Sequence, residues 1–181
     1  MHQIIITSHS YDLRLLSFNN YTKLIQSSLQ DKEVAREQGD LSENFGYVEA
    51  KNEVEKYRRM QQELGLSLES LVIINPINWA TSENSNSRVQ IGKVIKLQIN
   101  GDDDSIFIGG AWDADLKNDN IAPYTSPLAQ CILNKTVGEI AMLPANKLTI
   151  KILKVETPTL EFLEKLYPKK VKKEKEQCME L

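Results

Sequence analysis

The stretch YVEAKNEVEKYRRMQQELGLSLESL, residues 47–71, repeats apolar side chains at alternating steps of three and four residues. That spacing places them along one side of an α-helix and is typical of a coiled-coil stripe. The charged residues between them, such as Glu53 and Lys56, would form a solvated face. The stripe, apolar at seven of its eight positions, comprises Tyr47, Ala50, Val54, Tyr57, Gln61, Leu64, Leu68 and Leu71. We therefore expect a long helix that packs this side against a second helix.

The residues before this stretch can supply the partner helix. Between about Ser10 and Leu71 the sequence has no proline, and its glycines are Gly39, Gly46 and Gly65. Because the two halves of this region have similar lengths, they predict an antiparallel helical hairpin over residues 1–74, with the segment GDLSEN, residues 39–44, at its far tip. The first half has a broader apolar face without a clean heptad, made of Leu13, Leu16, Tyr21, Leu24, Ile25, Leu29, Val34 and Ala35.

The sequence pattern changes after Leu71. Residues 75–87 contain a proline and several serines and asparagines, and they predict a linker. Residues 88–156 alternate apolar and polar side chains and predict a small α+β domain of antiparallel strands. Within it, Ser126 and Pro127 fit the N-cap and first position of a short helix. Residues 157–181 are rich in lysine and predict a charged, solvated tail.

Composition excludes several classes of function. The formal net charge is −3, so the chain lacks the global basic field of a dedicated duplex-binding protein. Cys131 and Cys178 are the only cysteines, and together with His2 and His9 they show no zinc-ligand spacing. No segment approaches the roughly 20 apolar residues that a membrane span requires. We expect a protein of the reducing cytoplasm without membrane association.

The tip segment carries two carboxylates that allow two interpretations. Asp40 fits the N-cap of the second helix, and Glu43 fits its capping-box partner, with Gly39 ending the first helix. The same spacing of three residues puts both carboxylates on one side of the tip. Two such oxygen donors suit Mg²⁺, which fills its remaining positions with water and phosphate oxygens. The local sequence leaves both interpretations open, and they are compatible.

Four blocks of the sequence, in order, resemble one known family. AREQGDLSENFGYVEAK, residues 35–51, is similar to the tip of the bacterial transcript cleavage factors GreA and GreB. IITSHSYDLRLL, residues 5–16, stands where that family has its opening threonine and first helix, and IFIGGAWDAD, residues 106–115, resembles a family segment that ends in Glu-Ala-Asp. Residues 124–156 are similar to its Ser-Pro-containing closing region. The resemblance covers nearly the whole chain to about Glu156.

The resemblance implies a fold and a mode of action. It implies an α+β protein with an N-terminal antiparallel coiled-coil hairpin and a C-terminal FKBP-like antiparallel β-sheet domain with a short helix. The implied partner is bacterial RNA polymerase, whose secondary channel the coiled coil enters. There the tip would help to hold a Mg²⁺ of the polymerase active centre and stimulate the polymerase's own cleavage of nascent RNA in backtracked, arrested complexes. The chain would not be an enzyme by itself, and we expect a monomer when it is free.

The resemblance also assigns roles to individual residues. Asp40 and Glu43 match the catalytic, Mg²⁺-coordinating pair, and Ser42, Asn44 and Tyr47 match positions that support the tip. Arg36 and Lys51 match basic positions that contact nascent RNA or polymerase, although helix-face charges in water explain them equally well. Ser126 and Pro127 match a polymerase-docking loop, an assignment that the residues alone cannot separate from the helix start described above.

The sequence departs from the family pattern at several places. Phe45-Gly46 replaces a small residue followed by an acid, which puts a large apolar group at the tip and suggests a partner surface. Asn134 replaces a glycine, and asparagine also tolerates positive φ. The change at Phe45 keeps an alternative open, a channel-binding regulator that does not promote cleavage. Two further alternatives are a prolyl isomerase and a plain coiled-coil scaffold.

Overall fold

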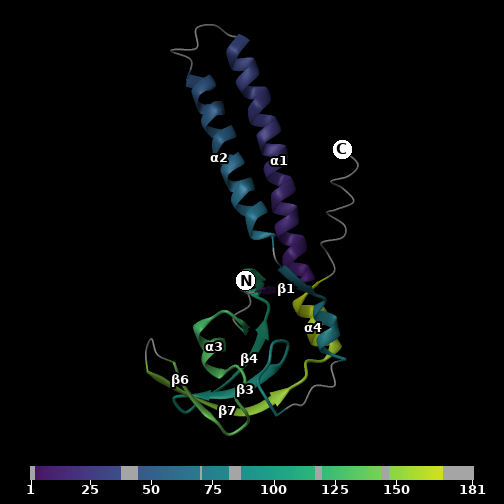
Figure 1. The fold of residues 1–181 in the computed structure, drawn as a ribbon, viewed down its shortest axis with the longest axis vertical. Helices are drawn as coiled ribbons and strands as arrows, with labels where there is room; N and C mark the ends of the chain where they lie inside the picture. Colours follow the sequence, from purple (N-terminus) through teal and green to yellow (C-terminus); the bar gives the residue numbers. More distant parts are fainter. Residues whose placement is uncertain are drawn as a thin grey trace. The chain divides into compact units, whose positions relative to one another are not determined.

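The computed structural model describes residues 3–37, 45–69, 71–81, 87–116, 120–143 and 147–168. The chain forms two compact units, one made of Asp12–Ser70 and the other of Met1–Tyr11 together with Leu71–Leu181. Figure 1 shows the elements of both. The predicted α+β class, with an N-terminal helical hairpin and a C-terminal sheet domain, is confirmed.

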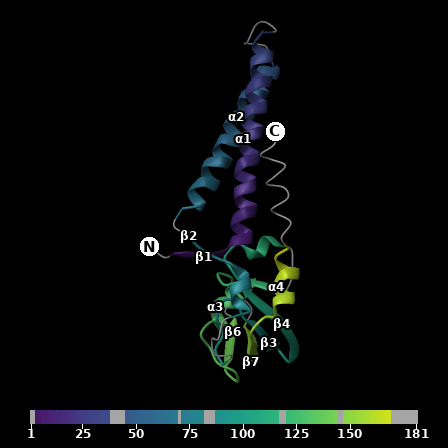
Figure 2. The same cartoon turned by 90° about the vertical axis from the view of Figure 1, so that its right-hand side faces the viewer.

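The first unit is the helical hairpin, which consists of most of α1 (Ser8–Glu37) and of α2 (Phe45–Ser67). The two helices lie side by side in both Figure 1 and Figure 2. Tyr21 stacks on Tyr57 with ring centroids 6.5 Å apart. Nearer the tip, the Ser28 hydroxyl donates to Glu53 at 3.1 Å. The later residue of α1, Ser28, therefore contacts the earlier residue of α2, Glu53, so the two helices are antiparallel.

The seam between the helices agrees with the prediction for α2 but only partly for α1. Ala50, Val54 and Leu64 of the predicted α2 stripe are buried. In α1, however, Leu24, Leu29 and Val34 of the predicted apolar face are exposed, by 40%, 38% and 56%, so this part of the prediction was wrong. The covered positions of α1 instead follow a heptad through Phe18, Tyr21, Ile25, Ser28, Lys32 and Ala35.

Polar side chains explain why that heptad is hard to recognise from the sequence. Ser28 is only 3% exposed and satisfies its hydroxyl by donating to Glu53. Lys32 is half-buried, with its Nζ 5.5 Å from the centroid of the Tyr47 ring. A lysine can cover apolar surface with its aliphatic stem while its charge stays near water. Two polar residues therefore occupy seam positions without an unsatisfied group.

Two short strands bracket the hairpin and belong to the second unit. β1 (Ile4–Thr7) pairs in parallel with β2 (Leu71–Ile74), with Ile4 opposite Leu71. Parallel strands need a long crossover connection, which here is the whole hairpin. The 3₁₀ helix η1 (Pro76–Trp79) follows β2 directly. Trp79 is buried, so the predicted linker over 75–87 begins with a packed segment.

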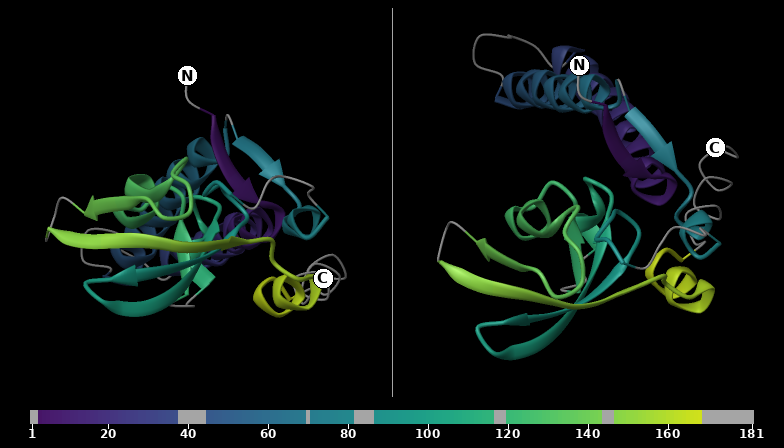
Figure 3. Two further views of the ribbon diagram at one scale, coloured as in Figure 1. Left: turned by 90° about the horizontal axis from the view of Figure 1, so that it is seen from below. Right: turned by 60° about the horizontal axis from the view of Figure 1, so that its bottom comes forward.

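The second unit is built on a five-stranded sheet with the order β5-β4-β3-β7-β6. Its strands are β3 (Val94–Ile99), β4 (Asp102–Gly109), β5 (Ile121–Pro123), β6 (Ile140–Leu143) and β7 (Leu148–Glu156). Figure 3 shows β7 as a long strand of this sheet, between β3 and β6. All neighbours are antiparallel except β4 and β5, which are parallel, a departure from the expected antiparallel sheet. Asn100 and Gly101 turn β3 into β4 with φ of 51° and 105°, as a tight hairpin requires.

Two short helices contribute buried side chains to the two hydrophobic clusters of this unit. α3 (Pro127–Ile132) contributes Ala129 and Ile132 to the larger cluster over the sheet. The second cluster joins Trp79 and Phe107 to α4 (Leu160–Leu166). α4 lies in the expected charged tail, so residues 160–167 correct that expectation: Leu163, Leu166 and Tyr167 are spaced along one helical face and are buried. The 3₁₀ helix η2 (Asp113–Leu116) follows β4.

None of the helices in the described residues is long and apolar enough to cross a membrane.

Candidate functional site at the hairpin tip

The described residues end on both sides of the tip segment. α1 ends at Glu37 and α2 begins at Phe45, so seven residues connect them. The predicted site residues Asp40, Ser42, Glu43 and Asn44, and the predicted capping box, lie outside the described residues. Their position in the chain still places them between two helix ends that pack together, because Ala35 and Ala50 are both buried. The segment that contains both carboxylates therefore connects the paired ends of the two helices in the chain.

Tyr47 has a role in closing the hairpin next to the tip. It is half-buried in the seam, and the Lys32 ammonium lies over its ring. A cation over an aromatic ring contributes about 0.5–1 kcal/mol at a partly exposed site. The contact ties the last turns of α1 to the first turn of α2. This geometry is consistent with the predicted supporting role of Tyr47.

Arg36 and Lys51 are both exposed near the tip. The Arg36 guanidinium pairs with Glu33, one turn earlier on the same helix, and the two side chains are 59% and 54% exposed. An exposed ion pair of this kind contributes about 0–1 kcal/mol. Its weakness leaves Arg36 able to exchange Glu33 for another anion.

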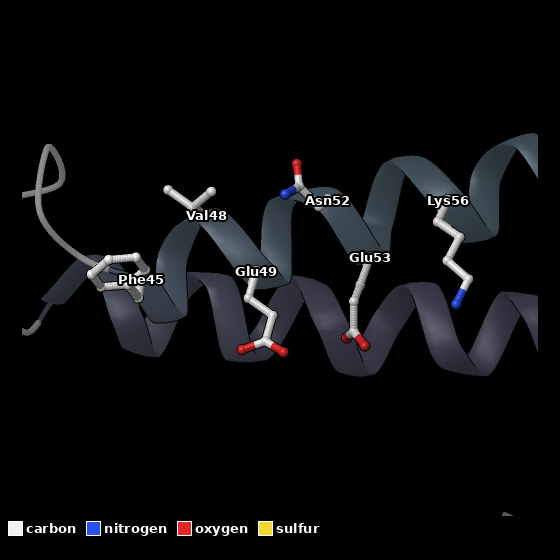
Figure 4. A pocket seen from close by; sticks show the side chains of 6 residues that line it. All are labelled: Phe45, Val48, Glu49, Asn52, Glu53 and Lys56. Atoms are coloured by element: carbon white, nitrogen blue, oxygen red, sulfur yellow. The ribbon is translucent and has the colours of Figure 1, made fainter.

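A shallow pocket lies on α2 beside the tip (Figure 4). Its lining is formed by Phe45, Val48, Glu49, Asn52, Glu53 and Lys56. Phe45 is 88% exposed and Val48 is 46% exposed, so two apolar side chains face water in the first turns of the helix. The sequence identified Phe45 as unusual but did not single out its neighbours, although steps of three and four residues connect them.

The predicted docking residues Ser126 and Pro127 begin α3. The Ser126 hydroxyl accepts a hydrogen bond from the Ala129 backbone N–H at 3.2 Å, and Pro127 is the first helical residue. The predicted N-cap is therefore confirmed. Pro127 is exposed, so the start of α3 is accessible. Asn134, after the helix, has φ of 65°, which confirms the expected positive φ.

A buried polar network in the second unit was not found from the sequence. Its centre is the Asp113 carboxylate, which has no exposed surface. Asp113 accepts hydrogen bonds from the Thr7 and Ser10 hydroxyls at 2.7 and 2.5 Å, from the Gly110 N–H at 2.7 Å and from the Tyr167 hydroxyl at 2.6 Å. Burial, together with the negative charge of Asp113, raises the pKa of Tyr167.

The same network explains the double glycine at residues 109–110. A Cβ on Gly109 would lie 2.6 Å from the Asp113 carboxylate, and a Cβ on Gly110 would lie 3.0 Å from the Thr7 backbone nitrogen. Thr7 also caps α1, because its Oγ1 accepts from the Ser10 N–H at 3.2 Å. The start of α1, the loop after β4 and the end of α4 therefore meet at one carboxylate.

In the part of the chain that the structure describes, no group of three or more His, Cys, Asp and Glu side chains is arranged to hold a metal ion.

Two family models together match most of the chain. The model of the N-terminal domain of transcription elongation factors matches residues 4–73, and the model of the GreA/GreB C-terminal domain matches residues 84–157. Transcription elongation factor GreA of Neorickettsia sennetsu is 37% identical over 127 residues, which is 67% of this chain and 76% of that protein.

The chain belongs to the GreA/GreB family of transcription elongation factors.

Other GreA proteins match at similar levels. GreA of Thermosipho melanesiensis is 29% identical over 147 residues, covering 80% of this chain and 89% of that protein. GreA of Streptococcus thermophilus is 34% identical over 127 residues, covering 68% and 76%. Among solved structures, GreA factor homolog 1 (Gfh1) of Thermus thermophilus is similar with a TM-score of 0.37 and 18% identity, over 86% of this chain and 99% of that one.

The family matches correspond to the two parts of this GreA/GreB chain. The N-terminal match includes β1, both hairpin helices and most of β2, and the C-terminal match includes the five-stranded sheet and α3. α4 lies beyond both matched ranges. Its Tyr167 nevertheless binds Asp113, a residue inside the C-terminal match.

Proposed function

We propose that this GreA/GreB-family elongation factor enters the secondary channel of bacterial RNA polymerase and stimulates the polymerase's cleavage of nascent RNA in backtracked, arrested complexes. The observation that carries the proposal is an antiparallel two-helix hairpin whose connecting segment contains Asp40 and Glu43. α1 has 30 residues, so it extends about 45 Å at ~1.5 Å per residue. That length suits an element that carries side chains into a narrow channel.

The chemistry of the donor set supports a role for Mg²⁺. Asp40 and Glu43 would supply two hard carboxylate oxygens, which Mg²⁺ accepts together with water and phosphate oxygens. Two carboxylates do not complete an octahedral shell, so we expect the remaining ligands to come from the polymerase active centre and the RNA. A Mg²⁺ shared in this way activates water and neutralises charge on a phosphodiester. The catalytic activity would therefore belong to the polymerase, and this chain would not act as an enzyme alone.

The other residues take supporting roles in this proposal. Ser42, Asn44 and Tyr47 would hold the tip, and the contact of Lys32 with Tyr47 supports that role for the tyrosine. Arg36 and Lys51 would contact nascent RNA or polymerase, since both are exposed beside the tip. The exposed start of α3 at Ser126 and Pro127 would dock on the polymerase. We expect the factor to act in the cytoplasm and to be a monomer when free.

The test uses polymerase elongation complexes that are stalled in a backtracked state with 5′-labelled RNA. Added protein should shorten the RNA, and Asp40→Asn or Glu43→Gln should abolish the shortening while each variant still competes with labelled wild type for polymerase. Asp31→Asn, a change at an exposed acid within α1, is the matched control and should cleave normally. The proposal is wrong if both tip variants retain full cleavage.

The second candidate is a channel-binding regulator that does not promote cleavage. The observation that favours it is the exposed Phe45 beside the tip. Its ring can change the position that the Asp40 and Glu43 carboxylates take in the polymerase active centre. In the same assay this candidate predicts tight competition for polymerase with no shortening of RNA by the wild-type protein.

A further inference from the structure

We propose that Phe45, Val48, Glu49 and Glu53 form a second docking surface, which binds a basic side chain, arginine or lysine, from the wall of the polymerase channel. This inference rests on the proposed function, because it takes the polymerase as the partner of the tip. The surface is the pocket on α2 in Figure 4. It adds a binding role for residues outside the predicted tip pair.

The apolar part of this surface is not used by the fold. The hairpin seam takes Tyr47, Ala50 and Val54 from α2, and these residues are half-buried or buried. Phe45 and Val48 lie off that stripe and are 88% and 46% exposed. Burial of a phenylalanine side chain is favourable, so this exposed ring offers binding energy that the free protein does not use. Contiguous apolar side chains beside polar ones are typical of interaction sites.

The charges of the pocket select the occupant. Glu49 and Glu53 line it, and Figure 4 shows both carboxylates on the same side of α2. Glu53 accepts the Ser28 hydrogen bond through one oxygen. Lys56, at the far end of the pocket, has its Nζ 5.4 Å from the centroid of the Tyr57 ring. The pocket therefore combines an aromatic ring and an aliphatic side chain with two carboxylates and one ammonium, so its negative charges outnumber its positive ones.

An arginine or lysine matches the apolar side chains and both carboxylates at once. Its aliphatic stem can cover Phe45 and Val48 while its cation pairs with Glu49 and Glu53. A guanidinium can also stack on the Phe45 ring. The carboxylates disfavour RNA, whose phosphates carry the same sign of charge. The chemistry of the pocket thus favours a basic protein side chain over nucleic acid.

The position of Phe45 in the chain identifies which protein carries that side chain. Phe45 follows Glu43 by two residues, so their Cα atoms lie no more than about 7 Å apart. A surface that receives the Glu43 carboxylate is therefore within contact distance of the Phe45 ring. If the tip enters the polymerase, the wall next to the active centre must also meet Phe45.

The experiment measures polymerase binding and cleavage separately for matched variants. Phe45→Ala should weaken competition for polymerase about ten-fold, the change that ~1.4 kcal/mol produces. Its cleavage rate is compared with that of the wild type at saturating protein, so that weaker binding is separated from slower cleavage. Glu49→Lys should also weaken binding, and Glu49→Gln should make binding less dependent on salt. Leu66→Ala is the control, since Leu66 is 61% exposed at the other end of α2.

Each outcome separates this inference from the proposed function. If wild type binds and cleaves but Phe45→Ala binds as tightly as Leu66→Ala, the docking surface is wrong and the proposed function stands. If Asp40→Asn and Glu43→Gln both cleave fully, the proposed function is wrong. Two further results would overturn the docking surface. In the first, sedimentation equilibrium shows that the wild type is a dimer and that Phe45→Ala is a monomer. In the second, Phe45→Ala lowers the cleavage rate at saturating protein without weakening binding to polymerase. Circular dichroism checks that each variant keeps its helix content.

Discussion

Replacement of Tyr167 by phenylalanine tests the buried network around Asp113. The Tyr167 hydroxyl donates to the Asp113 carboxylate at 2.6 Å, and both residues are buried. The ring packs against Trp79 and Phe107 with centroid distances of 6.4 Å each. Phenylalanine keeps those ring contacts and creates no cavity, so the substitution removes little more than the hydrogen bond. A hydrogen bond to a charged group contributes about 1.5–3 kcal/mol, and we expect Tyr167→Phe to lower the free energy of unfolding by about 2 kcal/mol at neutral pH.

The pH dependence of this difference distinguishes the hydrogen bond from simple packing. Burial and Asp113 raise the folded-state pKa of Tyr167, whereas an unfolded tyrosine has a pKa of about 10. Below that pH both states keep the proton, so the contribution of the hydroxyl is fully present. Above it only the unfolded state releases the proton, and wild-type stability falls by about 1.4 kcal/mol per pH unit relative to the variant. The difference of about 2 kcal/mol should therefore disappear near pH 11.5.

Tryptophan fluorescence during urea unfolding is a suitable assay. Both tryptophans, Trp79 and Trp112, belong to the unit that contains Tyr167, so their signal follows that unit. With a slope of about 2 kcal/mol per molar urea, the expected shift in midpoint at pH 8 is about 1 M. Tyr57→Phe is the control, because Tyr57 lies in the other unit and stacks on Tyr21. A difference between wild type and Tyr167→Phe that stays constant from pH 8 to 11 would refute the reasoning.

Two further substitutions test the hairpin and the start of α3. Gly65→Ala should stabilise the hairpin by about 0.5–1 kcal/mol, because alanine is the better helix former and its Cβ would lie at an ordinary 3.5 Å from the Phe18 ring. Thermal unfolding followed by circular dichroism should show a higher midpoint, and a lower midpoint would contradict the prediction. Ser126→Ala should lower stability by about 1 kcal/mol through loss of the N-cap, whereas Ser126→Asn should retain it. If Ser126 also docks on polymerase, Ser126→Asn should weaken competition for polymerase although its urea midpoint is unchanged; equal binding by Ser126→Asn and wild type would limit the residue to capping.

The helical hairpin could be predicted because its strongest signal is local. The apolar heptad of α2 repeats over a sequence long enough to define one face, and its buried residues Ala50, Val54 and Leu64 follow that repeat. The seam of α1 could not be recognised because Ser28 and Lys32 occupy it. Their places depend on partners in α2, Glu53 and Tyr47, that only the folded pair brings near. Apolar patterning identifies a seam only where the seam is apolar.

The candidate site was predicted by motif rather than by geometry. The tip residues Asp40 and Glu43 stand close together in the sequence, so a short segment is enough to predict them. The Asp113 network has the opposite character, because Thr7 lies 106 residues and Tyr167 lies 54 residues from Asp113 in the chain. No local pattern connects three such positions. The tail prediction failed for a different reason: the lysines of residues 157–181 obscured the short apolar spacing of Leu163, Leu166 and Tyr167.

The Asp113 network also bears on how the tip is carried. Thr7 and Ser10 bind Asp113 at the beginning of α1, and the same uninterrupted helix ends at Glu37, three residues before Asp40. The Tyr167 hydroxyl therefore binds the same Asp113 carboxylate that holds Ser10 in the first turn of α1, and α1 leads to the tip. If that anchoring contributes to function, Tyr167→Phe should slow RNA cleavage at temperatures where the wild type is still folded, with both tip carboxylates intact. If cleavage is unchanged while stability falls as expected, the network serves the fold of the C-terminal unit alone.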